Sequence, residues 1–256
     1  MKKKFASLCK YIAIFSNWPY AAFARYMGNR MPKQLDLHFR DGRQISFRPA
    51  SDSVALGEIF VAEGYSACCR LDQGIQNIWD IGGNIGGFVV WASKLFPKAH
   101  FTSFEPCQAT FRVLSATKRG NSRINWELCD TGLSSQDEIC TAFVPNGHFG
   151  EASRYLKSGQ EVEFRLRGIE SVWEEAGRPV LDLVKIDCEG GEYSILEGCS
   201  DFLLSKINAI IMEIHPIPGH RSEEIKHRLE SVGFQTEWFH GSQGVAFAHR
   251  TQVVHT

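Results

Sequence analysis

The stretch Asn77-Ile-Trp-Asp-Ile-Gly-Gly-Asn-Ile-Gly-Gly87 decides the fold, because an apolar strand runs here into a glycine turn. A helix follows from about Gly86 until Pro97 ends it, with an apolar stripe formed by Phe88, Trp91, Ala92 and Leu95. A strand, a glycine turn and a helix in this order are typical of a parallel sheet that binds its ligand at the carboxyl ends of its strands.

Strands and helices continue to alternate after this unit, which predicts an α/β fold with crossover helices. Two closing segments, 234–239 and 244–248, lie close enough in sequence to form an antiparallel edge. The long connection between residues 129 and 181 is a candidate lid or substrate loop. The remaining predicted elements are strands at 100–104, 124–129, 138–144, 161–167, 181–186 and 207–212, and helices near 109–119 and 222–232.

The first part of the chain has a different pattern. Residues 35–48 alternate apolar and polar side chains around Asp41-Gly42, which predicts a β-hairpin. An amphipathic helix is expected within residues 1–18 and a short helix at 53–62. We therefore expect an N-terminal extension over residues 1–62, with a basic helix, a hairpin and a short helix, followed by the main domain over 63–256.

Charge is distributed unevenly along the 256 residues. Residues 1–35 hold seven Lys or Arg and no Asp or Glu, and removing these from the overall charge of −1 leaves −8 on the rest. An acidic body lacks the clustered cations that phosphate contacts need, so we expect no nucleic-acid partner. We expect the helix in the basic N-terminal segment to pack on the rest of the protein, and contact of this segment with a membrane surface is the less favoured alternative.

Composition excludes several other classes of protein. With 43% hydrophobic and 22% charged residues, the chain has the composition of a globular protein. The sequence contains no run of about 18 uncharged apolar residues, so it predicts no membrane-spanning helix. The eight cysteines include no Cys-x-x-Cys pair, so neither a zinc site nor a disulfide framework is indicated, and we expect a reduced, cytoplasmic protein.

The glycine turn indicates a nucleoside cofactor. Glycines allow close approach of a ligand to the backbone, and Glu105, at the end of the next strand, can accept the hydroxyls of a ribose. Asn84 interrupts the dinucleotide fingerprint G-x-G-x-x-G, and Asp80 would repel a pyrophosphate but attract the ammonium of an amino acid. This pattern favours S-adenosylmethionine over a nicotinamide cofactor.

These segments resemble the successive motifs of FkbM-type class I methyltransferases. The matching residues are Trp79-Asp-Ile-Gly-Gly-Asn-Ile-Gly86, Ser103-Phe-Glu-Pro106, Val184-Lys-Ile-Asp-Cys-Glu-Gly-Gly-Glu192 and Met212-Glu-Ile-His215. The resemblance covers roughly residues 50–215. It implies a Rossmann-like class I methyltransferase fold, with a mostly parallel seven-stranded sheet and helices on both faces. It also implies methyl transfer from S-adenosylmethionine to a hydroxyl of a sugar, glycan or other small acceptor.

The resemblance also implies roles for residues at matching positions. The methionine end of the cofactor would lie among Asp80, Gly82, Gly83, Asn84, Gly86 and Asp187. Glu105 would hold the ribose, and Asp130 would face the adenine amine, although Asp130 lies in a segment that matches the family only loosely.

Charged residues at the ends of the strands 181–186 and 207–212 are the candidates for proton transfer. We expect Asp187 or His215 to act as the general base, with Lys185, Glu189 and Glu213 around it. The alternative is a structural ion network. The spacing of these residues is unlike that of metal ligands, so we expect no metal, and a Mg²⁺ site on Asp187, Glu189, Glu213 and His215 is the less favoured possibility. The loop His148–Tyr155 is a candidate acceptor contact.

Two other functions remain open at this point. One is a methyltransferase-like binding protein without catalysis, which would use its basic N-terminal segment to hold a partner, and the other is a nicotinamide-dependent oxidoreductase. The expected partner is a small-molecule or carbohydrate acceptor, with association into a homo-oligomer left open.

Overall fold

The computed structural model describes residues 2–61, 64–72, 74–145, 148–239 and 244–250. Its centre is a seven-stranded sheet in the order β11-β12-β10-β9-β3-β4-β5. Only β12 runs in the direction opposite to the other six strands, which confirms the predicted mostly parallel α/β sheet with an antiparallel edge. The strands are β3 (Asn77–Ile81), β4 (His100–Phe104), β5 (Trp126–Cys129), β9 (Leu183–Ile186), β10 (Ala209–Ile214), β11 (Gln235–Phe239) and β12 (Gly244–His249).

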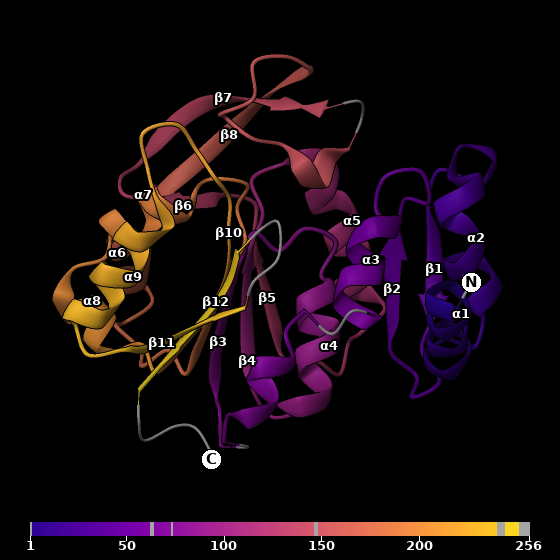
Figure 1. Cartoon of the computed structure of the whole chain (residues 1–256), viewed down its shortest axis with the longest axis horizontal. Helices are drawn as coiled ribbons and strands as arrows, with labels where there is room; N and C mark the ends of the chain where they lie inside the picture. Colours follow the sequence, from indigo (N-terminus) through magenta and orange to yellow (C-terminus); the bar gives the residue numbers. More distant parts are fainter. Residues whose placement is uncertain (1, 62–63, 73, 146–147, 240–243, 251–256) are drawn as a thin grey trace.

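Helices cover both faces of this sheet, as predicted (Figure 1). Along β3, Ile78 packs with α4 and α5, whereas Trp79 and Ile81 pack on the opposite face, because successive side chains of a strand point to opposite faces. Apolar residues on both faces therefore make β3 a central, buried strand. One face carries α4 (Gly87–Leu95) and α5 (Gln108–Arg119), and the other α6 (Ile169–Glu175), α7 (Glu192–Glu197), α8 (Asp201–Ser205) and α9 (Ser222–Ser231).

The N-terminal extension differs from the prediction in its helices. Two helices, α1 (Lys2–Ile14) and α2 (Trp18–Met27), replace the single expected helix, because Pro19 stands in the first turn of α2, where a missing N–H costs nothing. The predicted hairpin is present as β1 (Leu35–His38) and β2 (Gln44–Phe47), and the short helix as α3 (Ser53–Phe60).

The hairpin packs directly on the main body. The side-chain amide of Asn121, just after α5, donates to the Gln44 carbonyl, while its oxygen accepts from the Gln44 N–H. Phe47 belongs to the same hydrophobic cluster as Phe88 and Leu114. One core thus spans the extension and the body, and the predicted boundary between residues 62 and 63 lies outside the described residues.

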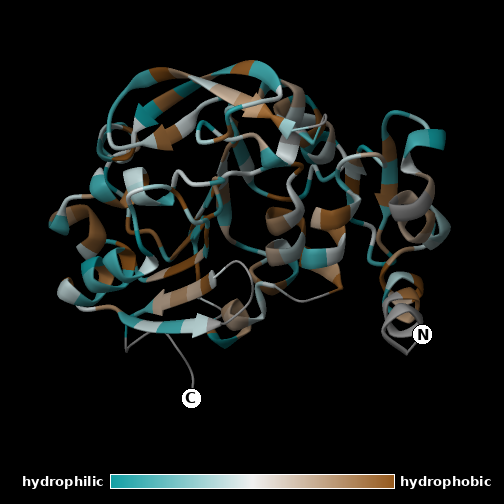
Figure 2. Ribbon diagram, turned by 45° about the horizontal axis from the view of Figure 1, so that its top comes forward, coloured by the Kyte–Doolittle hydropathy of each residue, from teal (hydrophilic) through white to brown (hydrophobic). Residues whose placement is uncertain are grey.

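The long connection after β5 folds into a separate three-stranded sheet in the order β6-β8-β7 (Figure 1, top). Its strands are β6 (Gly132–Ser134), β7 (Glu138–Val144) and β8 (Gln160–Gly168), and the sequence predicted β7 and β8 but not the short β6. Figure 2 shows hydrophilic and hydrophobic residues alternating along β8. The apolar Phe164 and Leu166 of β8 face the cavity described below.

No helix among the described residues is long and apolar enough to cross a membrane.

Candidate active site

A cavity of about 650 Å³ opens at the carboxyl ends of the parallel strands. Gly82 and Asn84 of the glycine turn line it together with Glu105 after β4. Asp187 after β9 and Glu213 near the end of β10 line the same cavity, and the insertion supplies a further wall that includes Ser153, Arg154, Tyr155, Phe164 and Leu166. Residues from both predicted groups, cofactor-binding and catalytic, therefore share one space.

The glycine turn has a backbone that few residues other than glycine adopt. Gly82 and Gly86 have φ values of +78° and +89°, and Asn84 between them has +47°. The N–H groups of Gly82 and Gly83 donate to the carbonyl of Phe104, 3.0 and 2.9 Å away, which joins the turn to β4. A Cβ on Gly82 would lie 1.9 Å from the carbonyl oxygen of Asp187. The cofactor end and the catalytic end of the cavity are thus packed backbone to backbone.

A buried polar network supports the turn from below. Asp80 is fully buried, and its Oδ2 accepts from the Ser103 hydroxyl at 2.8 Å, which in turn accepts from the indole N–H of Trp126 at 2.9 Å. The Lys185 ammonium lies 3.3 Å from Oδ1 of Asp80 and donates to the Gly82 carbonyl at 2.6 Å. Burial opposes the charge of Lys185, but Asp80 raises its pKa well above the ordinary value, so the ammonium stays charged.

Glu105 is held in place by the backbone. Its two carboxylate oxygens accept from the N–H groups of Asn84 and Cys107 at 2.9 and 2.8 Å. Burial raises the pKa of Glu105 to about 7, although these two hydrogen bonds act in the opposite direction. Each oxygen keeps a second lone pair, so Glu105 can still accept hydroxyl groups from a ligand.

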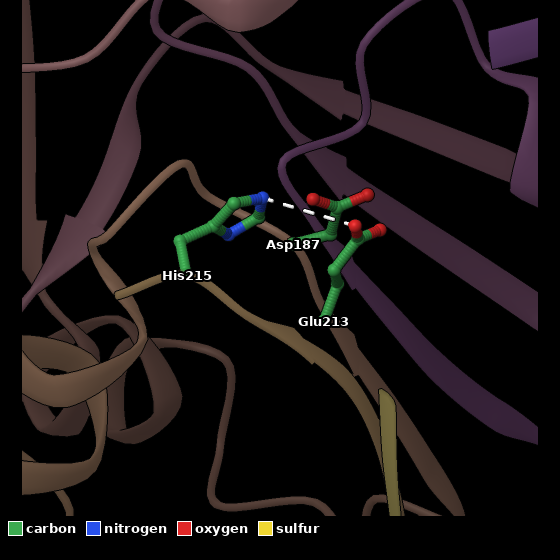
Figure 3. A group of neighbouring side chains, drawn as sticks. All are labelled: Asp187, Glu213 and His215. Carbon is green, nitrogen blue, oxygen red and sulfur yellow. Dashed lines mark ion pairs between the residues drawn. The ribbon is translucent and has the colours of Figure 1, made fainter. Parts of the chain in front are cut away.

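The ends of β9 and β10 bring an imidazole among several carboxylates. His215 Nδ1 lies 3.0 Å from Oε1 of Glu192, and Nε2 lies 3.6 Å from Glu189 and 3.9 Å from Glu213. Figure 3 shows the imidazole of His215 facing the neighbouring carboxylates of Glu213 and Asp187. One ligand atom from each of these three residues lies within 4.8 Å of the other two.

Burial and neighbouring charges shift the pKa values of His215, Glu189 and Glu213. Burial would lower the pKa of His215, but the hydrogen bond to Glu192 and the nearby negative charges raise it to about 9. Burial raises the pKa of Glu189 to about 7. Burial and the negative charge of Asp187 raise the pKa of Glu213 to about 7 as well. At neutral pH the imidazole is therefore protonated while Glu189 and Glu213 are poised between their two states.

The remaining predicted site residues lie elsewhere. Gly83 and Gly86 lie in the turn and Asp80 and Lys185 lie behind it, but none of the four is among the residues that line the cavity. Asp130 lines a neighbouring cavity of about 620 Å³, which borders the first at Pro106 and Cys107. The roles predicted for these residues in cofactor binding stay predictions.

Sequence reasoning missed the residues that act through others. Glu192 is fully buried and accepts from the N–H groups of Cys188 and Gly190 as well as facing His215. Ser103 and Trp126 complete the network under Asp80. Glu192 closes the Asp187–Glu192 motif, so its place in that motif was a usable signal. Trp126 carried no such signal, because it reads as an ordinary apolar residue of β5.

The donor set fits a nucleoside cofactor. Oδ1 of Asn84 is buried without a hydrogen-bond partner among the described residues, so it is available to a ligand in the cavity. Glu105 presents free lone pairs beside it, and the second cavity adds the Arg112 side chain and Asp130 beyond Pro106. A carboxylate and an amide are groups that can hydrogen-bond a ribose and an amino-acid moiety, which fits S-adenosylmethionine.

The chain matches the model of the methyltransferase FkbM domain family over residues 80–236. It is 26% identical over 220 residues to the AMB antimetabolite synthetase AmbE of Pseudomonas aeruginosa, a match that covers 70% of this chain but only 10% of that protein. It is 23% identical over 214 residues to the 31-O-demethyl-FK506 methyltransferase FkbM of Streptomyces tacrolimicus, with 68% and 82% covered. To the hexuronic acid methyltransferase AglP of Haloferax volcanii it is 27% identical over 161 residues, with 62% and 64% covered.

Proposed function

This chain belongs to the methyltransferase FkbM domain family, and from that premise we propose that it methylates a hydroxyl group of a sugar or another small molecule. The methyl donor is S-adenosylmethionine. The names of two relatives support the acceptor class, since one acts on 31-O-demethyl-FK506 and the other on a hexuronic acid.

One observation carries this proposal: the same cavity of about 650 Å³ is lined by Asn84 and Glu105, which are expected to bind the cofactor, and by Asp187, which is expected to accept a proton. A methyl transfer needs the cofactor and the acceptor in one space, with a group that takes the acceptor's proton. The close contact between Gly82 and the Asp187 carbonyl supports this proposal, because it fixes the distance between the glycine turn and the backbone of Asp187.

At the cofactor side, Glu105 would accept the ribose hydroxyls and Asn84 would contact the methionine end. When bound, S-adenosylmethionine supplies an electrophilic methyl group on a sulfonium. Lys185 is a positioning residue in this scheme, since its ammonium joins the Gly82 carbonyl to Asp80 and to Asp187, 3.7 Å away.

At the acceptor side, the hydroxyl must lose a proton as it reacts. His215 is already protonated at neutral pH, with a pKa of about 9, so it is a poor base. We therefore favour Asp187, which lines the cavity directly beside the glycine turn, as the group that accepts the proton. His215 then holds the neighbouring carboxylates Glu189 and Glu213 in place through its positive charge.

Calorimetric titration of S-adenosylmethionine into the wild type and a Glu105→Gln variant tests the cofactor side. At pH 8 the variant should bind about 10-fold more weakly, a loss of roughly 1.4 kcal/mol. Ribose hydroxyls bind the ionised carboxylate, so below a pKa of about 7 binding must also remove a proton. Wild-type affinity should therefore rise with pH up to about 7 and then level off, and the variant should lack this component.

Equal affinity and equal pH dependence in the two proteins would contradict the role of Glu105. Binding of NADH in place of S-adenosylmethionine would revive the oxidoreductase alternative. Tight binding of S-adenosylmethionine without methyl transfer to any hydroxylated acceptor would favour a binding protein without catalysis.

The insertion is the proposed acceptor wall. Tyr155 lines the cavity, and its ring lies over Gly190, where a Cβ would come within 2.7 Å of it. A Tyr155→Ala variant should raise the KM of a sugar acceptor by roughly 2- to 10-fold, because aromatic contacts contribute about 0.5–1.5 kcal/mol. Tyr20→Ala, on an exposed residue of α2, is the matched control. An unchanged KM in the Tyr155 variant would place the acceptor elsewhere.

A further inference from the structure

We propose that Asp187, Glu213 and His215 form a binding site for one divalent cation, which holds the acceptor oxygen during methyl transfer. The site itself is argued from the ligand geometry, while its role in catalysis rests on the proposed function. The expectation that no metal binds came from spacing along the chain. The structure brings together ligands from the ends of two neighbouring strands, β9 and β10, which linear spacing does not reveal.

The ligand atoms have a separation that one ion can span. All lie within 4.8 Å of one another, and His215 Nε2 lies 3.9 Å from Oε1 of Glu213. Around an ion with bonds of about 2.1 Å, neighbouring ligands lie about 3 Å apart and opposite ligands about 4.2 Å apart. The observed separations are somewhat longer than these, so the side chains would move closer together on binding, and Figure 3 shows the imidazole and the two carboxylates next to one another.

His215 is oriented as metal-binding histidines are. Its Nδ1 is held at 3.0 Å by Glu192, which is itself fully buried and fixed by the Cys188 N–H. This contact directs Nε2 toward Glu213 and Glu189 at distances too long for a hydrogen bond. A carboxylate behind the ring of a histidine ligand is a common arrangement in metal sites, because it fixes the ring and strengthens the nitrogen as a ligand.

The local charge also favours a cation. Asp187, Glu189 and Glu213 expose only 27%, 29% and 27% of their side chains and crowd around the one imidazole of His215. Lys185, the cation that pairs with Asp187, lies closer to Asp80 than to Asp187 and also donates to the Gly82 carbonyl. Half-buried carboxylates in excess are costly unless paired or bound to a metal.

The two carboxylates are suitable ligands for Mg²⁺ or Mn²⁺, and the imidazole nitrogen makes Mn²⁺ the better candidate of the two. Three protein ligands leave positions open for the acceptor hydroxyl and water. The hydroxyl proton would pass to the carboxylate oxygen of Asp187 that does not bind the ion. The oxygen lone pair then forms the new O–CH₃ bond, and the electrons of the breaking S–CH₃ bond stay on sulfur. The ion takes the place of the ring proton at Nε2, so its binding releases that proton.

The test is titration of Mn²⁺ into the full chain, followed by electron paramagnetic resonance and calorimetry. We expect one Mn²⁺ per chain, with a modulation from the imidazole nitrogen in the spin-echo signal. Glu213→Gln and His215→Ala should each weaken Mn²⁺ binding by at least about 10-fold, and the nitrogen modulation should vanish in the His215 variant. Glu151→Gln, which removes another carboxylate from the same cavity, should bind Mn²⁺ as the wild type does.

Binding of S-adenosylmethionine to each variant checks that it is folded. Absence of stoichiometric Mn²⁺ binding to the wild type, or equal Mn²⁺ affinity in all four proteins, would overturn the proposed site. Failure of the cation's role can be distinguished from failure of the proposed function. Methyl transfer by a chelator-treated enzyme would support the proposed function and refute a catalytic role of the cation. Conversely, Mn²⁺ binding without methyl transfer would retain the site and refute the function.

Discussion

An Asp187→Asn variant should methylate its acceptor about 10²- to 10⁴-fold more slowly in kcat, the usual contribution of a positioned general base. The amide keeps the size of the side chain but can neither accept the acceptor proton nor serve as an anionic ligand. Because Asp187 is also expected near the methionine end of the cofactor, the affinity for S-adenosylmethionine should fall as well, but by less than kcat. Single-turnover transfer and calorimetric binding, measured on the same preparation, separate these two effects.

The control for this substitution is Asp201→Asn. Asp201 lies on α8, where its carboxylate pairs with Arg228, and it is absent from the residues that line the cavity. It should therefore keep its rate. If kcat of the Asp187 variant fell by less than about 10-fold, proton transfer would have to be assigned to another group, with Glu213 and Glu189 next in line.

A Gly82→Ala variant should lose about 2–5 kcal/mol of its free energy of unfolding. A left-handed backbone costs an ordinary residue about 1–2 kcal/mol, and forcing extra atoms into a packed site costs about 1–3 kcal/mol more. The clash is with backbone, since the new Cβ would lie 1.9 Å from the Asp187 carbonyl oxygen, and flexible side chains cannot relieve it. Urea denaturation measures the loss, and binding of S-adenosylmethionine should fall with it.

Gly42→Ala separates the two causes. Gly42 in the β1–β2 turn has φ +90°, close to that of Gly82, but nothing lies within 4 Å of its added Cβ. It should show only the backbone cost of about 1–2 kcal/mol. Equal losses in the two variants would mean that the turn can move away from β9, against the close packing described above.

The central sheet was predictable because its residues obey local rules. The apolar run 77–81, the glycines after it and the alternation of strands with helices all follow from periodicity and turn chemistry. The short helix α7 escaped because Glu192–Glu197 is too brief to show a helical period. The split between α1 and α2 escaped because hydrophobic spacing alone does not mark where Pro19 starts a new helix.

The site was predictable only in part for a related reason. Asn84, Glu105, Asp187 and His215 stand in motifs at the ends of strands, and all four line the cavity. Their support comes from pairs far apart in sequence, such as Glu192 with His215. Burial and side-chain direction also distinguish residues that the sequence does not. Lys185 and Asp187 belong to one motif, but Lys185 lies behind the glycine turn whereas Asp187 lines the cavity.

The insertion forms a sheet of its own, in which β6, β7 and β8 pair only with one another among the described strands. Its residues line the wall of the cavity proposed for the acceptor, and its described strands do not pair with the parallel strands. New loops and side chains can therefore accumulate there over evolutionary time with few changes at the glycine turn, against which the insertion packs through Gly150 beside Asn84. Diversification of acceptors within such a family can then proceed largely outside the methyl donor's site, and exchange of residues 138–168 between relatives, which leaves Asp130 in place, is a natural route for engineering acceptor choice.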